Sequence, residues 1–421
     1  MTVTEPGTQP VTERVTLAAG ASDAEIIAAV EAWLRAHLPE DWQAAVARGD
    51  LAAVEAIRED PERGPAWFDL LGDSGLATPT WPVEHGGLGL PADRGAVVTE
   101  TLARYRAERH NRDFVGLVLA GHTILEWGSP EQKAERLPAL RRGREFWCQL
   151  FSEPGAGSDL AGLSTRAVQQ ADGTWLVNGQ KVWNSYAHLA DFGLLMARTD
   201  PSAPKHRGIT YFLLDMRTPG VEPRPLKQMT GNAEFNETFL TDVVVPDSAR
   251  IGPVNQGWSV AITTLMQERN GLSGRPAVGP GEADELVGRA VGNGSWEDPV
   301  LRDRLLEAYV EEKVLQMTTV RSFVASGDAA PTAEGSIRKL AHSVLAEKLG
   351  VLGTDLEADG AVAWDPAEGS EAADRFLAMK TYSIAGGTSE IQRNIIAERV
   401  LGLPKDPDPE RHLPFNERGR G

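Results

Sequence analysis

The period of the hydrophobic pattern changes twice along this chain, and few folds accommodate that order. Up to about residue 140, apolar residues recur three and four positions apart, as Ile26, Val30 and Trp33 do, which is typical of amphipathic helices. From about 145 to 245, short apolar runs are punctuated by Gly, Pro and Asp, which indicates strands. The helical period then returns near Gly257. The sequence therefore predicts an α+β protein in which one block of strands lies between two helical blocks.

Local signals define several of these elements. Ser22 and Glu25 have capping-box spacing, and Ser129 and Gln132 repeat it with a proline at the first helical position. Further helices are expected over 42–58, 64–73, 91–108, 112–127, 257–275, 298–326, 333–354, 371–384 and 388–401. Strands are expected over 145–151, 163–168, 174–177, 180–183, 192–198, 210–215, 221–225 and 237–245. Asp172-Gly173 is typical of a hairpin turn, and residues 276–300 and 353–370 are expected to be loops.

The composition argues against several classes of partner. The 421 residues carry a formal net charge of −18, which repels phosphate backbones and anionic membranes, so nucleic acid is not expected to bind. No apolar run approaches the roughly 20 residues that span a bilayer, and residues 1–21 are expected to form a disordered tail. A single cysteine, Cys148, rules out an intrachain disulfide, suits a reducing cytoplasm and is expected to be a packed strand thiol. The eight histidines form no His-x-x-x-His pair, so no metal site is predicted.

A small-residue loop follows the first expected strand. The stretch Gln149-Leu-Phe-Ser-Glu-Pro-Gly-Ala-Gly-Ser-Asp159 ends in residues that let the backbone approach a ligand closely. A dinucleotide fingerprint would require a third glycine where Leu160 stands, and a helix where another strand follows, so that fold is excluded. Taken alone, the stretch is also compatible with an ordinary tight turn.

Two later segments add to this signal. Lys181-Val-Trp-Asn-Ser185 places a tryptophan at the end of an expected strand, where a place in the core is the ordinary alternative. Gly386-Gly-Thr-Ser-Glu-Ile-Gln-Arg393 puts two glycines before a helix, with Ser389 and Gln392 at capping-box spacing. Such a helix start presents free N–H groups to an anion such as a cofactor pyrophosphate, although a plain capped helix has the same pattern.

In this order and at these separations, the three segments resemble the acyl-CoA dehydrogenase family, which oxidises acyl thioesters with FAD. The resemblance runs from about residue 22 to the C-terminus. It implies an N-terminal helical domain, a middle β-barrel or sandwich domain and a C-terminal four-helix-type bundle. The expected bounds are a tail over 1–21, the three domains over 22–143, 144–254 and 255–404, and a second tail over 405–421.

The resemblance also implies roles for individual residues. Ser158 and Arg269 would contact the substrate, Trp183 would pack on the flavin, and the Ser152 hydroxyl would donate to the flavin ring. The residues expected to contact FAD are Gln149, Leu150, Phe151, Ser152, Trp183, Asn184, Ser185, Thr388 and Glu390.

The position of the catalytic base is the unusual feature. Removing the α-proton of a thioester requires a carboxylate within hydrogen-bond reach, in a dry pocket. The family's commonest place for that glutamate corresponds to Gly386, whose backbone N–H could still hold the thioester carbonyl. In a second arrangement within the family, the glutamate comes from the first helix of the bundle, and the matching residue here is Glu268. A structural ion pair is the alternative role for this side chain.

The implied activity is FAD-dependent α,β-dehydrogenation of an acyl-CoA to a trans-2-enoyl-CoA, with Glu268 and the flavin taking the proton and the hydride. Electrons would pass to an electron-transfer flavoprotein, and the chain would form a homodimer or homotetramer without stable membrane insertion. Two alternatives stay open: a flavin-dependent monooxygenase on the same fold, and a non-catalytic subunit of a heteromeric acyl-CoA dehydrogenase. Many family members use an Arg-x-x-Phe-Gly segment and a Gln-x-x-Gly-Gly-x-Gly segment to hold the cofactor of a neighbouring subunit. This sequence has neither segment, which fits the non-catalytic alternative.

Overall fold

The computed structural model describes residues 14–18, 20–272, 281–326, 334–364 and 369–418. It divides into two compact units, Met1–Phe146 and Trp147–Gly421, and each is described by itself. Among the helices of the described residues, none combines the length and the apolar character that a membrane-spanning helix needs.

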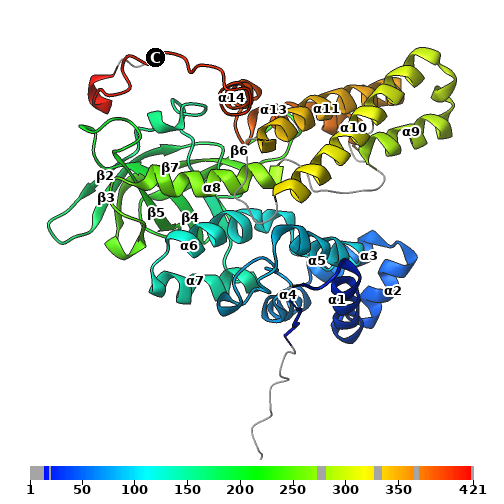
Figure 1. The fold of residues 1–421 in the computed structure, drawn as a ribbon, viewed down its shortest axis with the longest axis horizontal. Coiled ribbons are helices and arrows are strands. Elements are labelled where there is room, and N and C mark those ends of the chain that lie inside the picture. Colours follow the sequence, from blue (N-terminus) through cyan, green and yellow to red (C-terminus); the bar gives the residue numbers. More distant parts are fainter. Residues whose placement is uncertain (1–13, 19, 273–280, 327–333, 365–368, 419–421) are drawn as a thin grey trace, which may run out of the picture. The chain divides into compact units, whose positions relative to one another are not determined.

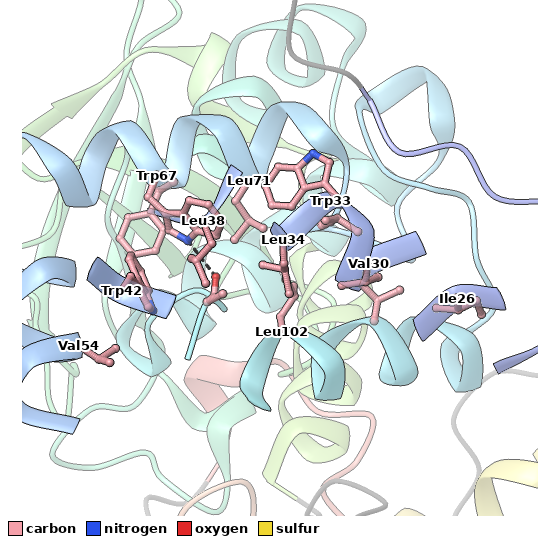
Figure 2. Packing of buried hydrophobic residues seen from close by; sticks show 14 of the residues in the cluster. Ile26, Val30, Trp33, Leu34, Leu38, Trp42, Val54, Trp67, Leu71 and Leu102 are labelled. Atoms are coloured by element: carbon pink, nitrogen blue, oxygen red, sulfur yellow. Dashed lines mark hydrogen bonds between the residues drawn. The ribbon is translucent and has the colours of Figure 1, made fainter. Parts of the chain in front are cut away.

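The first unit is helical (Figure 1). Its α-helices are α1 (Asp23–His37), α2 (Glu40–Arg48), α3 (Leu51–Arg58), α4 (Arg63–Ser74), α5 (Ala92–Arg104), α6 (Gly121–Trp127) and α7 (Pro130–Arg142), with a π-helical turn at Val115–Ala120 before α6. Both predicted capping boxes, at Ser22 and Ser129, are confirmed. Figure 2 shows the core, in which α1 packs through its apolar stripe and the indole N–H groups of Trp42 and Trp67 donate to backbone carbonyls.

The second unit begins with an eight-stranded sheet. Its order is β6-β7-β3-β2-β4-β5-β8, and β1 pairs in parallel with β4. The strands are β1 (Trp147–Leu150), β2 (Arg166–Gln169), β3 (Trp175–Lys181), β4 (Phe192–Arg198), β5 (Ile209–Asp215), β6 (Val221–Leu226), β7 (Phe235–Val245) and β8 (Arg250–Ile251). Strands β2 and β3 form the predicted hairpin around Gly173, which has the positive φ of +86° that such turns require.

A helical bundle follows the sheet in the same unit. Its helices are α8 (Gly257–Leu272), α9 (Glu282–Asn293), α10 (Pro299–Ser326), α11 (Glu334–Glu357), α12 (Glu371–Ala378), α13 (Lys380–Ile384) and α14 (Ser389–Ile395), with a π-helical turn at Ile396–Val400. Helix α8 lies along the sheet and packs against β5 (Figure 1). A Cβ at Gly257 would come within 2.6 Å of the Thr210 backbone, so glycine lets α8 begin directly against the strand.

The predicted order of helices, strands and helices is confirmed, but several bounds are wrong. The helix expected over 42–58 is two helices, because Gly49 ends α2 in the left-handed conformation and Asp50 caps α3. The expected loop over 276–300 contains α9, whose buried Leu286 and Ala290 pack against α10 and α11. The runs expected at 174–177 and 180–183 are one strand, β3, with an irregularity in its pairing to β7.

A buried ion pair fixes the loop that leaves β1. The Glu153 carboxylate accepts from the Lys181 ammonium at 2.8 Å, from the Ser164 hydroxyl at 2.8 Å and from the Thr165 backbone N–H at 2.9 Å. The Lys181 side chain is fully buried and also donates to the Phe151 carbonyl at 3.0 Å. Burial alone would raise the pKa of Glu153, but the Lys181 charge and the hydrogen bonds outweigh it and bring the pKa to about 2. The loop is therefore held at both ends by one ionised carboxylate.

Glu153→Gln keeps the size of the side chain and leaves Lys181 buried without its counter-charge. We expect the free energy of unfolding of this unit to fall by about 3 kcal/mol near neutral pH. Because the folded-state pKa is about 2 and the ordinary value is 4.5, the stabilisation is present above about pH 5 and is lost as the pH falls toward 2. Urea titrations of the two proteins should therefore converge on acidification. Glu222→Gln, which removes an exposed partner of Arg224, is the control; an equal loss in both variants would contradict the assignment.

Candidate active site

Strand β1 presents Gln149 to helix α8. Cys148 and Leu150 are both fully buried in the sheet's core cluster, so the alternation of a strand turns Gln149 to the opposite face. The Gln149 amide nitrogen donates to the Glu268 carboxylate at 3.1 Å. The side chains predicted to act as cofactor contact and as base are therefore in direct contact.

Glu268 stands one helical turn after Thr264 on the same face of α8. Thr264 is fully buried, and its hydroxyl lies 3.1 Å from the Tyr211 hydroxyl of β5. Glu268 itself is half-buried. The packing of α8 on the sheet thus places a carboxylate at the boundary between protein interior and solvent, where a substrate could reach it.

Two buried groups of the sheet near this carboxylate stay protonated. Burial raises the pKa of Tyr211 well above its usual range, and the nearby Glu268 charge raises it further. Burial likewise raises the pKa of the Cys148 thiol, so this cysteine is the packed thiol that the sequence predicts and not a nucleophile. Neither Tyr211 nor Thr264 is predicted from the sequence. The position of Thr264, four residues before Glu268, is the signal that identifies it as a neighbour on the same helix face.

The loop after β1 presents an open backbone surface. The Phe151 ring packs edge-on against Tyr211 at 5.7 Å, and the Ser152 carbonyl accepts from the Val182 N–H at 2.9 Å. A Cβ built at Gly155 or Gly157 would meet nothing within 4 Å. Ser158 is exposed and Ser152 is half-buried. Both residues are therefore open to solvent in part, and their predicted contacts with cofactor and substrate stay predictions.

Trp183 is the most exposed tryptophan whose exposure is described. It is 61% exposed, has a positive φ of +63°, and packs edge-on against Phe235 with 6.0 Å between ring centroids. The flanking Val182 and Asn184 are buried. The strained backbone thus turns a large flat ring outward at the point where the chain leaves β3.

Asn184 points into the protein. Its side-chain amide nitrogen donates to the Gln149 backbone carbonyl at 2.8 Å, and its own backbone carbonyl accepts from the Asn236 side-chain amide at 2.9 Å. The Leu150 side chain is fully buried as well, which leaves only its main chain for any contact with a cofactor. Ser185 is half-buried beside Trp183. The predicted cofactor contacts of Asn184 and Leu150 stay predictions, and the observed role of Asn184 is to tie this segment to β1.

The glycine pair of the last motif adopts a left-handed backbone. Gly386 and Gly387 have φ of +65° and +89°. The buried Gln392 amide donates to the Gly386 carbonyl at 2.8 Å and to the Gly387 carbonyl at 3.2 Å. The expected Ser389–Gln392 capping box is wrong: Thr388 is the N-cap and accepts from the Ile391 N–H, while Gln392 turns back to the glycines.

The other predicted residues differ in what the structure says of them. Glu390 is exposed and pairs with Arg393 at 3.4 Å. The side chain of Arg269 lies outside the described residues. In the part of the chain that the structure describes, Glu55, Glu59 and His110 form the one group whose ligand atoms could share a metal ion, but its carboxylates are exposed and belong to the first unit.

Comparison with known proteins gives this geometry its context. Three domain models match the chain in order: the acyl-CoA dehydrogenase N-terminal domain over 24–144, the middle domain over 148–243 and the C-terminal domain over 255–401. The chain belongs to the acyl-CoA dehydrogenase family. It is accordingly an FAD-dependent acyl-CoA dehydrogenase, as its motifs predict.

Curated relatives agree with this assignment. Acyl-CoA dehydrogenase FadE34 of Mycobacterium tuberculosis is 42% identical over 85% of this chain. The match covers only 50% of the length of FadE34. Acyl-CoA dehydrogenase IpdE1 of Mycolicibacterium smegmatis is 37% identical over 87% of this chain and 96% of its own length. Among solved structures, the Tcur3481-Tcur3483 steroid ACAD superposes with a TM-score of 0.73 at 26% identity, over 91% of this chain and 98% of that chain. The ChsE4-ChsE5 complex from Mycobacterium tuberculosis gives a TM-score of 0.69 at 26% identity, with the same shares covered.

The residues present suit a flavin. Trp183 offers a flat apolar face at the surface, and the segment with Gly155 and Gly157 has room for close approach of a ligand. The side-chain carbonyl oxygen of Asn184 is buried and has no hydrogen-bond partner among the described residues. An isoalloxazine ring requires this combination of a stacking surface and nearby polar atoms. These groups would hold FAD, whose ring supplies the hydride acceptor of the family's reaction.

Trp183→Ala tests this surface. Because the side chain is 61% exposed, its removal should leave the thermal midpoint of the FAD-free protein close to wild type. Loss of a stacking partner should weaken FAD binding about tenfold, which flavin fluorescence titration measures. Val300→Ala, at a site that is 67% exposed, should change neither quantity. FAD affinity equal to wild type in Trp183→Ala would remove this residue from the cofactor site.

Proposed function

We propose that this chain removes hydrogen from the Cα–Cβ bond of an acyl-CoA, giving the trans-2-enoyl-CoA, with Glu268 as the base. The contact between Gln149 and Glu268 carries the proposal, because it holds a half-buried carboxylate against the strand that leads into the ligand-facing loop. FAD, when bound, would supply the hydride acceptor for the β-carbon, and Glu268 would take the α-proton.

The protein's part in proton removal is to hold an ionised carboxylate near the α-carbon. The Gln149 amide is a neutral donor, so it fixes the direction of the Glu268 carboxylate without adding a positive charge. Neighbouring Tyr211 stays protonated because burial and Glu268 both raise its pKa. A carboxylate in such surroundings loses water when a substrate covers it, which makes it a stronger base.

Gly386 has a separate part in this proposal. Its N–H would donate to the thioester carbonyl oxygen and stabilise the negative charge that develops as the α-proton leaves. Support comes from the rigid backbone: Gln392 holds the carbonyls of both Gly386 and Gly387. Ser158, exposed on the loop after β1, would contact the thioester arm of the substrate, and Arg269 would contact it from α8.

The acyl group and the electron acceptor complete the proposal. A solved relative is described as a steroid ACAD, which favours bulky cyclic acyl groups in a substrate panel beside straight and branched chains. Electrons would leave to an electron-transfer flavoprotein. The relatives solved as complexes of two chains keep open a heteromer in which a second chain completes the site.

Glu268→Gln removes the base and keeps the hydrogen-bonding shape. When the FAD-loaded wild type is mixed anaerobically with a panel of acyl-CoAs, we expect flavin absorbance near ~450 nm to bleach; in Glu268→Gln the reduction rate should fall at least about a thousandfold with FAD content unchanged. Glu307→Gln, an exposed carboxylate on α10, is the matched control and should bleach like wild type.

The outcomes separate the alternatives. Bleaching retained in Glu268→Gln removes this residue from the chemistry. A wild type that no acyl-CoA reduces, but that consumes oxygen once its flavin is reduced, favours the monooxygenase. A chain that holds FAD only when mixed with a second, different subunit favours the heteromer. Rapid reoxidation of the substrate-reduced enzyme by an electron-transfer flavoprotein, but not by oxygen, supports that acceptor.

A second copy of the chain has a candidate surface on α10. This helix exposes an apolar stripe at helical spacing, in which Leu306, Val310, Val314 and Met317 are 44%, 57%, 56% and 69% exposed. A continuous apolar stripe on a water-exposed helix is typical of a surface that another chain covers. We therefore extend the proposal to a homodimer or homotetramer that uses this stripe.

Val314→Glu places a charge in the middle of the stripe. Because an interface cannot bury an unpaired carboxylate cheaply, we expect the mass measured by light scattering after gel filtration to fall to a smaller assembly. Glu307→Gln, on the same helix, should leave the mass unchanged. An unaltered assembly in Val314→Glu would place the interface elsewhere.

A further inference from the structure

Lys339 on α11 is a buried cation without a hydrogen-bond partner. The residue is 2% exposed, and its ammonium nitrogen, itself inaccessible to solvent, has no acceptor within the described residues. An ammonium group carries three donors, so burying it in this state costs several kcal/mol unless opposite charge compensates. The group therefore requires an electrostatic reason for its position.

Two carboxylates supply the opposite charge. Helix α11 packs against α14 and against α8, and the charged groups that act on Lys339 are Glu390 of α14 and Glu268 of α8. On the same helix, burial lowers the pKa of His342, and the charge of Lys339 lowers it further. Burial lowers the pKa of Lys339, and both carboxylates oppose that effect, which favours the charged form. Lys339 is thus a cation shared between the proposed base and the last motif.

The two carboxylates are not equivalent. Glu390 is exposed and already pairs with Arg393 at 3.4 Å, so solvent and a second cation screen it. Glu268 is half-buried, and the neutral Gln149 amide is one of the groups that contact it. Glu390 raises the pKa of Lys339 more than Glu268 does. Glu268 is nevertheless the carboxylate from which a bound substrate would displace water, and Coulomb interactions are stronger where water is scarce.

We propose that Lys339 is a positioning residue for the reaction: its charge keeps the Glu268 carboxylate ionised after the acyl-CoA has displaced water from the site. This inference rests on the proposed function, in which Glu268 is the base. Displacement of water would otherwise favour the protonated carboxyl, which cannot accept the α-proton. Lys339 therefore sets the lowest pH at which the enzyme works, without touching the substrate.

The test is the pH dependence of substrate-dependent flavin reduction in the FAD-loaded enzyme, with the acyl-CoA that reduces wild type fastest. Loss of a nearby positive charge raises the pKa of a carboxyl, and Glu268 must be deprotonated to act. The acidic limb of the rate profile should therefore move to higher pH by about one unit in Lys339→Met. Lys339→Arg keeps the positive charge, so its acidic limb should lie at the same pH as that of wild type.

Controls separate this role from a structural one. Lys348→Met removes a surface lysine from the same helix, where it pairs with Glu307 and Glu311, and should leave the limb in place. FAD content and thermal midpoints are measured for every variant, and Lys339→Gln is a second neutral replacement. Loss of fold or of FAD in both neutral variants assigns Lys339 a structural role and overturns the proposal.

The remaining outcomes distinguish this proposal from the one on which it rests. A wild type that no acyl-CoA reduces overturns both. If reduction depends on Glu268, but the acidic limb is the same in Lys339→Met and wild type, only the role of Lys339 is overturned. If the acidic limb of Lys339→Arg is shifted as far as that of Lys339→Met, the role of Lys339 is also overturned, because charge would then not be the cause.

Discussion

The hydrogen bond between Gln149 and Glu268 joins the sheet to the bundle at the proposed reaction centre. Its geometry depends on two periodicities. Strand alternation buries Cys148 and Leu150 and so turns Gln149 toward α8, while the helical turn aligns Glu268 with Thr264, which is fixed to Tyr211 of β5. A shift of one residue in β1 would exchange its buried and facing side chains and leave the carboxylate without this partner.

The backbone at the last motif has its own requirement. Gly386 adopts a φ of +65°, a conformation that costs a residue with a Cβ about 1–2 kcal/mol. The Gly386 carbonyl is also held by the buried Gln392. A glutamate in this left-handed conformation would carry that cost. A carboxylate on the regular helix α8 carries none, so the two possible locations of the base differ in what they require of the backbone.

The sequence predicted the order of helices and strands from local patterns with a physical cause, whereas the roles of the candidate site residues came from the family resemblance and stay predictions. Capping boxes at Ser22 and Ser129 and the hairpin at Gly173 are confirmed. Helix α9 was missed because its glycines hide the buried positions from a composition-based assignment. Lys339 could not be found, since nothing in the residues around it distinguishes a buried lysine from an exposed one; its role depends on which helices pack together. Composition likewise could not show that Asn184 turns inward.

Two glutamates near β1 show how surroundings decide the use of a carboxylate. Glu153 lies in the ligand-facing loop, yet Lys181, Ser164 and Thr165 take up its oxygens and hold its pKa at about 2. A carboxylate so stabilised is a poor proton acceptor and serves to fix the loop. The neutral Gln149 amide donates to Glu268, and the nearby cation Lys339 acts on it without a direct hydrogen bond. A base needs positive charge nearby to stay ionised, but it loses basicity when several strong donors lower its pKa as far as they lower that of Glu153.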